Sequence, residues 1–160
     1  RWMFEQSYRT PLLIKWPGIT KPGSVNDDMV SNIDLPETFL EMAGVKIPSD
    51  MQGRSMVPVL QGNTPADWRK EHYYHYYEYP GSHMVKCHYG MSTERYKLIH
   101  YYYDIDEWEL YDIKVDPEEI ENVYNDPAYT SIKADLHKRL TKLMGKYKDY
   151  DALAISFLPE

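Results

Sequence analysis

Histidines gather in the middle of the sequence, and metal binding is the first chemistry that their spacing suggests. His72, His75, His83 and His88 lie within one short stretch of the chain, and imidazoles are common zinc ligands. Residues 72–79 (HYYHYYEY) have the composition of a strand, however. Side chains three positions apart on a strand point to opposite faces, so His72 and His75 should not bind one ion together. We therefore do not predict a zinc site.

Two other arrangements of reactive residues are also incomplete. Asp104 and Asp106 begin like a calcium loop, but its sixth position is Glu109 instead of glycine, and its twelfth is Val115 instead of glutamate. The single cysteine, Cys87, alternates with aromatic and apolar residues on its expected strand, which favours a packed thiol over a nucleophile. The sequence lacks a glycine-rich phosphate loop, a GxSxG elbow and an HExxH motif. By itself it contains no complete catalytic site.

The chain is acidic, with 25 acidic and 18 basic residues and a net charge of -7. This charge argues against a surface for nucleic acid or for an anionic membrane, although sulfates or acidic sugars could still bind locally. No apolar run approaches the roughly 18 residues that a membrane span needs, so we expect a soluble chain. One cysteine excludes an internal disulfide.

The first half of the chain has the pattern expected at the end of an α/β sheet. Residues 10–16 (TPLLIKW) form an apolar run that predicts a strand buried on both faces. Residues 34–43 (DLPETFLEMA) predict a helix, with Asp34 as its N-cap and Gly44 as its stop. Residues 45–70 are interrupted by proline and glycine and predict a connecting loop.

The second half predicts a small antiparallel sheet with one covering helix. The pair Glu94 and Arg95 would form the turn of a hairpin, although it lacks the usual glycine or asparagine. Apolar residues at helical spacing predict a long helix over residues 128–148, after a start signal at Asp126 and Pro127. The expected strands cover residues 72–79, 86–93, 96–103 and 107–113.

Several stretches carry a family resemblance along nearly the whole chain. Residues 9–18 (RTPLLIKWPG), 30–45 (VSNIDLPETFLEMAGV), 93–102 (TERYKLIHYY) and 109–123 (ELYDIKVDPEEIENV) resemble the C-terminal third of the formylglycine-dependent sulfatases. These are arylsulfatase-like members of the alkaline phosphatase superfamily. Residues 75–90 (HYYEYPGSHMVKCHYG) are similar to bacterial carbohydrate sulfatases such as N-acetylglucosamine-6-sulfatases.

The resemblance implies the fold class and the division into domains. The chain would be an α/β (alkaline phosphatase-like) fragment that contains the last strand and helix of the large domain, then a small antiparallel sheet with a C-terminal helix. Residues 1–70 would form the C-terminal end of the large α/β domain and its connecting loop. Residues 71–160 would form the small C-terminal subdomain, with its long helix at 128–148.

The resemblance also implies a function whose chemistry lies elsewhere. The full protein would hydrolyse sulfate esters of carbohydrates, such as a 6-sulfated amino sugar of glycosaminoglycan or mucin glycans. Its formylglycine and its calcium ion (Ca2+) would lie in the N-terminal catalytic part, and this chain would begin just after the last catalytic residue. We therefore expect no catalytic residue and no metal ligand here, an inactive chain when alone, and a periplasmic or secreted protein.

Three residues are our candidates for contact with the sulfated carbohydrate. Arg1 would follow the family's active-site lysine and could reach the sugar. His83 lies in an expected loop, where an imidazole can hydrogen-bond a sugar hydroxyl. His88 would lie on the strand face opposite Cys87 and could line the cleft that binds the sugar. A structural hydrogen bond is the alternative role for this histidine.

Other conspicuous residues have a structural interpretation, and other functions stay open. We expect Asp112, Asp116, Glu119 and Asn122 to form hydrogen bonds in turns and helix caps, and the tyrosines to pack within the sheet. A phosphodiesterase or phosphomutase of the same superfamily would need two metal sites upstream. A free-standing carbohydrate-binding or interaction module without catalysis is the other alternative, and the expected buried strand at residues 10–16 argues against it.

Overall fold

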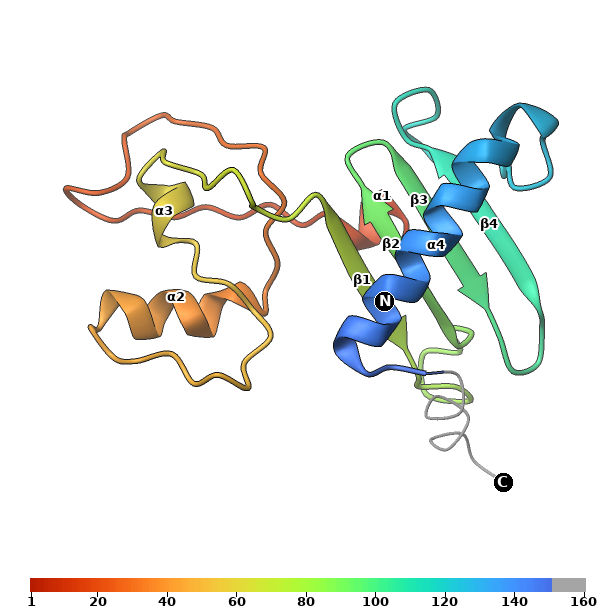
Figure 1. The fold of residues 1–160 in the computed structure, drawn as a ribbon, viewed down its shortest axis with the longest axis horizontal. Helices are drawn as coiled ribbons and strands as arrows, with labels where there is room; N and C mark the ends of the chain where they lie inside the picture. Colours follow the sequence, from red (N-terminus) through yellow and green to blue (C-terminus); the bar gives the residue numbers. More distant parts are fainter. Residues whose placement is uncertain (151–160) are drawn as a thin grey trace. The chain divides into compact units, whose positions relative to one another are not determined.

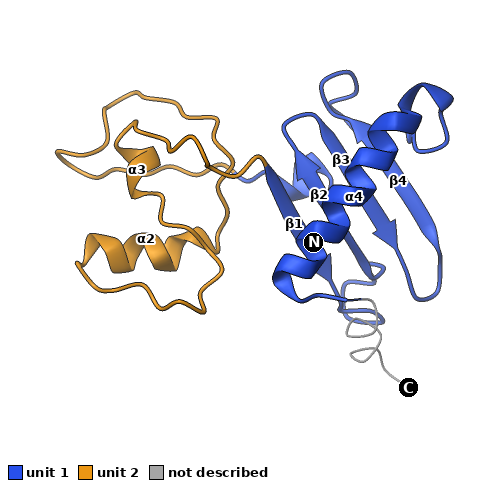
Figure 2. Cartoon of the chain, viewed as in Figure 1, with its two compact units in different colours: residues 1–10, 71–160 blue, residues 11–70 orange. Residues whose placement is uncertain are grey.

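The computed structural model describes residues 1–150, so the last ten residues of the predicted subdomain 71–160 lie outside the described residues. The chain forms two compact units (Figure 2), one from residues 1–10 and 71 onward and one from residues 11–70. The sequence predicts a domain boundary at residue 70. The structure also has a boundary there, but it groups residues 1–10 with the later unit because they pack on its sheet.

The later unit is built on a four-stranded antiparallel sheet with strand order β1-β2-β3-β4 (Figure 1). The predicted small sheet and its β2-β3 hairpin are therefore confirmed. The hydroxyl of Thr93 accepts hydrogen bonds from the backbone nitrogens of Arg95 and Tyr96, which closes this turn without a glycine. The strands are β1 (Glu71–Tyr76), β2 (His88–Thr93), β3 (Tyr96–Tyr101) and β4 (Glu107–Asp112).

One face of this sheet is covered by α4 (Thr130–Tyr147), as Figure 1 shows, and the predicted long helix is confirmed. A short turn of 3-10 helix, Pro127–Tyr129, precedes it, and the Asp126 side chain accepts from the nitrogen of Ala128. The apolar stripe of α4 packs against the sheet through Leu136, Leu140 and Leu143. None of the helices within residues 1–150 has the length and apolar character of a membrane span.

The opposite face of the sheet is covered by the first residues of the chain, including the short α1 (Glu5–Tyr8). Met3 is fully buried against β2 at Gly90, where a Cβ atom would lie 2.9 Å from the Met3 sulfur and would overlap the carbonyl oxygen of Leu98. Only glycine fits this close approach. Lys97 is also fully buried on this face, and its ammonium pairs with Glu5 at 2.9 Å and Glu119 at 2.5 Å.

The unit of residues 11–70 contains α2 (Asp34–Met42), which confirms the predicted helix, although Asp34 is its first residue and Ile33 occupies the N-cap position. The short α3 (Val57–Leu60) lies within the predicted loop. Asp34 is fully buried. Its carboxylate accepts from the backbone nitrogens of Ser31 and Arg54 and from the guanidinium of Arg69. The apolar core of this unit is small and centres on Met56, Val59 and Trp68.

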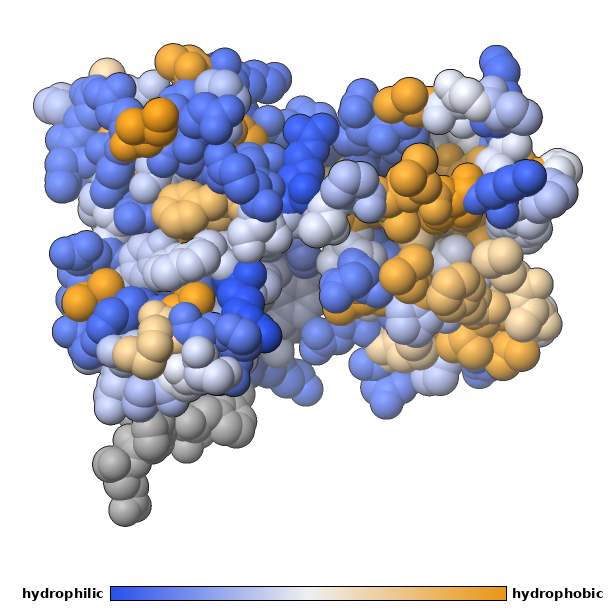
Figure 3. Space-filling model, turned by 180° about the vertical axis from the view of Figure 1, so that it is seen from behind, coloured by the Kyte–Doolittle hydropathy of each residue, from blue (hydrophilic) through white to orange (hydrophobic). Residues whose placement is uncertain are grey.

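The prediction of a buried strand at residues 10–16 is wrong for this structure. These residues have no regular secondary structure, and the side chain of Leu13 is 94% exposed. A strand buried on both faces requires neighbouring strands, and the sheet of residues 1–150 contains only β1 to β4. Apolar side chains consequently gather on the surface of this unit, which Figure 3 shows from one side.

Candidate functional site

His88 lies at the start of β2, on the sheet face that residues 1–8 cover. Its side chain is fully buried among four aromatic rings, and its Nδ1 donates to the carbonyl oxygen of Lys86 at 2.7 Å. Burial lowers its pKa to about 4, so the imidazole is neutral near pH 7. The geometry thus favours the structural hydrogen bond that we gave as the alternative to substrate contact. The four rings belong to Trp2, Tyr74, Tyr76 and Tyr101.

Arg1 lies close to His88 and is held at the end of β1. The hydroxyl of Tyr74 donates to the Arg1 carbonyl oxygen at 3.0 Å, and the Arg1 guanidinium lies 3.7 Å from a carboxylate oxygen of Glu78. That same Glu78 oxygen accepts from the hydroxyl of Tyr76 at 3.0 Å. About half of each charged side chain in the Arg1–Glu78 pair stays exposed, so the guanidinium is still accessible to an anionic or polyhydroxy ligand.

His83 lies in the loop of residues 77–87, which joins β1 to β2 and also carries Glu78. The imidazole is exposed, as expected for a loop residue that could reach a ligand. The loop is anchored behind it by Lys86, whose ammonium donates to the hydroxyl of Tyr79 at 2.8 Å and pairs with Asp104. The structure therefore places Arg1 and the His83 loop at the same end of the sheet, linked through Glu78.

A buried polar cluster on the α4 face holds the base of this loop, and the sequence analysis missed it. The carboxylate of Asp149 accepts from the hydroxyls of Tyr73 at 3.0 Å and Tyr77 at 2.8 Å, and from Nδ1 of His75 at 2.7 Å. Nε2 of His75 lies 2.7 Å from the hydroxyl of Tyr102. Burial and the nearby carboxylate raise the pKa of Tyr73 and Tyr77, so both hydroxyls remain donors.

The predictions about histidine and cysteine chemistry can be compared with this geometry. The ring of His72 packs on Tyr8 while that of His75 packs on Tyr77, so the two histidines lie on opposite sheet faces, as predicted. Within residues 1–150, no group of three or more histidine, cysteine or acidic side chains could hold a metal ion. Cys87 is fully buried, and burial raises its pKa, which confirms the predicted packed thiol.

The polar residues Asp112, Asp116, Glu119 and Asn122 have structural roles, as we predicted. Asp112 pairs with Arg95 at 2.8 Å, and this neighbour lowers the pKa of the carboxyl. Asp116 caps a turn, and the side chain of Asn122 accepts from two backbone nitrogens. The carboxylate of Glu119 accepts from the backbone nitrogen of Glu5, the first residue of α1, at 2.5 Å, and its other oxygen pairs with the buried ammonium of Lys97.

Comparison with known proteins identifies relatives along nearly the whole chain. The family model for N-sulphoglucosamine sulphohydrolase, C-terminal, matches residues 1–146. An N-acetylglucosamine-6-O-sulfatase of Bacteroides thetaiotaomicron is 50% identical over 94% of this chain and 27% of the relative. A multifunctional alkaline phosphatase superfamily protein of Trinickia caryophylli is 31% identical over 81% of this chain and 27% of the relative.

Solved structures also match most of this chain. The structure of BT4656 in complex with its substrate, D-glucosamine-2-N,6-O-disulfate, matches with a TM-score of 0.91 and 49% identity, over 94% of this chain and 31% of that chain. A phosphonate monoester hydrolase from Silicibacter pomeroyi matches with a TM-score of 0.70 and 26% identity, over 82% of this chain and 28% of that chain. The chain thus spans only about a quarter to a third of the length of these relatives.

Proposed function

The chain belongs to the N-sulphoglucosamine sulphohydrolase C-terminal family, and we propose that it is the C-terminal part of a sulfatase that hydrolyses sulfate esters of carbohydrates. The observation that carries the proposal is the match of nearly the whole chain to a Bacteroides N-acetylglucosamine-6-O-sulfatase. The matched relatives are several times longer than this chain, so the activity proposed is that of a longer protein.

We propose a 6-sulfated amino sugar as the substrate, within glycosaminoglycan or mucin glycans. The name of the Bacteroides relative and the glucosamine disulfate bound to BT4656 support this choice. From the family resemblance we also propose a periplasmic or secreted location.

The reactive groups would belong to the N-terminal part of the longer protein. The family resemblance implies calcium and formylglycine, but the described residues do not fit either group: residues 1–150 offer no metal-binding cluster, and the single cysteine is a packed thiol. This chain would instead supply substrate contacts and hold them in place. We propose that His83 and the guanidinium of Arg1 contact the sugar, with Glu78 orienting Arg1 and the Asp149 cluster holding the loop.

The N-terminal part would also be the physical partner of residues 11–70. Several large apolar side chains of this unit are exposed, including Leu13, Val25 at 87% and Phe39 at 60%. Exposed apolar area of this kind marks a surface that another structure covers. We propose that the N-terminal catalytic part covers the segment of residues 10–16, which would then gain the neighbours that its sequence requires.

The experiment that tests the proposal compares the longer protein with the 160-residue chain. Sulfate release from N-acetylglucosamine-6-sulfate is measured for both, before and after calcium is removed with a chelator. We expect the longer protein to release sulfate and the 160-residue chain to release none. The chelator should abolish sulfate release by the longer protein. Hydrolysis of phosphate or phosphonate esters without any sulfate release would favour the phosphodiesterase alternative. Glycan binding by the short chain, with no activity in any longer product of the gene, would favour the binding module.

A further inference from the structure

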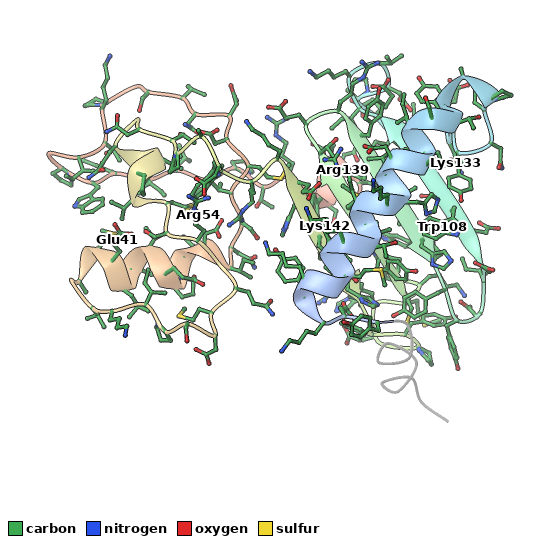
Figure 4. All side chains as sticks on the ribbon, in the orientation of Figure 1. Glu41, Arg54, Trp108, Lys133, Arg139 and Lys142 are labelled. Atoms are coloured by element: carbon green, nitrogen blue, oxygen red, sulfur yellow. The ribbon has the colours of Figure 1, made fainter. Side chains whose placement is uncertain are left out.

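A row of lysines lies on the exposed side of α4, opposite the apolar stripe that packs on the sheet. Lys138, Lys142 and Lys146 follow one another at intervals of four residues, so they are about 6 Å apart along the helix axis. All three are exposed, and Figure 4 labels Lys142 on this helix. We call these three residues the α4 lysine row.

The part of the chain that the structure describes forms no ion pair with the α4 lysine row, whereas the neighbouring Arg139 pairs with Glu71 at 2.8 Å and with Asp135 at 3.5 Å. The helix Thr130–Tyr147 contains five basic residues and one acidic residue, although the whole chain has 18 basic and 25 acidic ones. Positive charge is therefore concentrated on one surface of an acidic protein.

Helix stability does not account for this arrangement. Like charges four residues apart repel each other and destabilise a helix. A basic residue in the last turn interacts favourably with the helix dipole, which explains Lys146. Lys138 and Lys142 lie before that turn, so the dipole contributes little to them. Their spacing instead suits a ligand that carries negative charge at intervals along its length.

We propose that the α4 lysine row binds a sulfated glycan chain. The inference rests on the proposed function, because a sulfatase that acts within a sulfated glycan approaches a polyanion, although the net charge of this chain is -7. A local cluster of cations on such a protein raises the concentration of an anionic ligand and steers its approach. Sulfate groups stay ionised at all physiological pH values, so their contacts with lysine are weakened by salt and not by mild acid.

The test is binding of the longer protein to immobilised heparin at several salt concentrations. The variant carries Lys138→Gln, Lys142→Gln and Lys146→Gln. The matched control carries Lys21→Gln, Lys46→Gln and Lys114→Gln, three exposed and separated lysines, so its net charge changes equally. We expect the variant to bind about a hundredfold more weakly than the control, because each of the three lysines contributes about a factor of five near a dense anionic surface. Its salt dependence should also be shallower by about two to three in log-log slope, if each sulfate contact releases a counterion as phosphate contacts do.

Equal binding by the variant and the control would overturn the inference. Equally tight binding to unsulfated hyaluronan, to duplex DNA or to anionic vesicles would also overturn it, because any polyanion would then suffice. Sulfate release from the monosaccharide N-acetylglucosamine-6-sulfate is measured on the same variants and should not change. If neither the wild type nor the variants release sulfate, but heparin binding still depends on the α4 lysine row, the proposed function is wrong and the proposed binding surface is still supported.

Discussion

Acid should destabilise the folded chain through His88. This imidazole is buried among aromatic rings, and its pKa falls from an ordinary 6.5 to about 4. Between those two values the unfolded chain binds a proton that the folded chain does not bind. The free energy of unfolding therefore decreases as the pH is lowered through this range.

The size of the effect follows from the two pKa values. One pKa unit corresponds to about 1.4 kcal/mol, so His88 alone should reduce the free energy of unfolding by about 2 kcal/mol between pH 7 and pH 5, and by about 3 kcal/mol by pH 4. A total stability of about 5–15 kcal/mol is typical of small proteins, so this loss is a large part of it.

The assay is urea unfolding of the chain and of His88→Gln at pH 7, 6 and 5. We expect the variant to be less stable than the wild type at pH 7. Because glutamine does not titrate, the free energy of unfolding of the variant should fall by about 2 kcal/mol less than that of the wild type between pH 7 and pH 5. His83→Gln is the matched control, because this histidine is exposed, and it should follow the wild type. An equal loss in the wild type and in His88→Gln would refute the reasoning, since the buried imidazole would then not be the titrating group.

Three further single substitutions and one double substitution test the contacts on both faces of the sheet, each by the midpoint of urea unfolding. Asp149→Asn replaces an acceptor shared by two tyrosines and a histidine, and we expect a loss of about 2–4 kcal/mol; an unchanged midpoint would show that the carboxylate does not hold them. Glu119→Gln removes one of the two anions around the buried Lys97 and should cost about 3 kcal/mol or more. The double variant Glu119→Gln with Lys97→Met should regain part of the lost stability, because the buried charge of Lys97 is then removed. A further loss of stability would contradict the idea that this buried charge carries an energetic cost. Gly90→Ala should cost about 1–3 kcal/mol because its methyl group would overlap β3 and crowd Met3, so a neutral result would exclude this close approach.

The sequence predicted those parts of the fold whose pattern is local. Short runs of strand-like composition predict the four strands, and apolar residues at helical spacing predict α4, and both patterns depend only on near neighbours. The opposite orientation of His72 and His75 followed from strand geometry alone. These predictions needed no information about distant parts of the chain.

Contacts between distant residues could not be predicted in the same way. Asp149 lies 74 residues from His75, and Glu119 lies 114 residues from Glu5, so nothing in the local pattern indicates either pair. The packing of residues 1–10 on the sheet was missed for the same reason. The wrong prediction of a buried strand at residues 10–16 has another cause. An apolar run indicates that a segment is stable as a strand between neighbouring strands, but it does not indicate whether this chain contains those neighbours.

The two units differ in how far they complete their own cores, and this difference bears on how the chain would behave alone. The sheet is covered on both faces, by α4 and by residues 1–8, and its central apolar residues are fully buried. Residues 11–70 bury only a small cluster around Trp68 and leave Leu13 exposed. Apolar burial is the main favourable contribution to folding, so we expect the sheet unit to fold without help. Residues 11–70 should gain most from the rest of a longer protein, and hydrogen exchange of their amides should slow when that part is present.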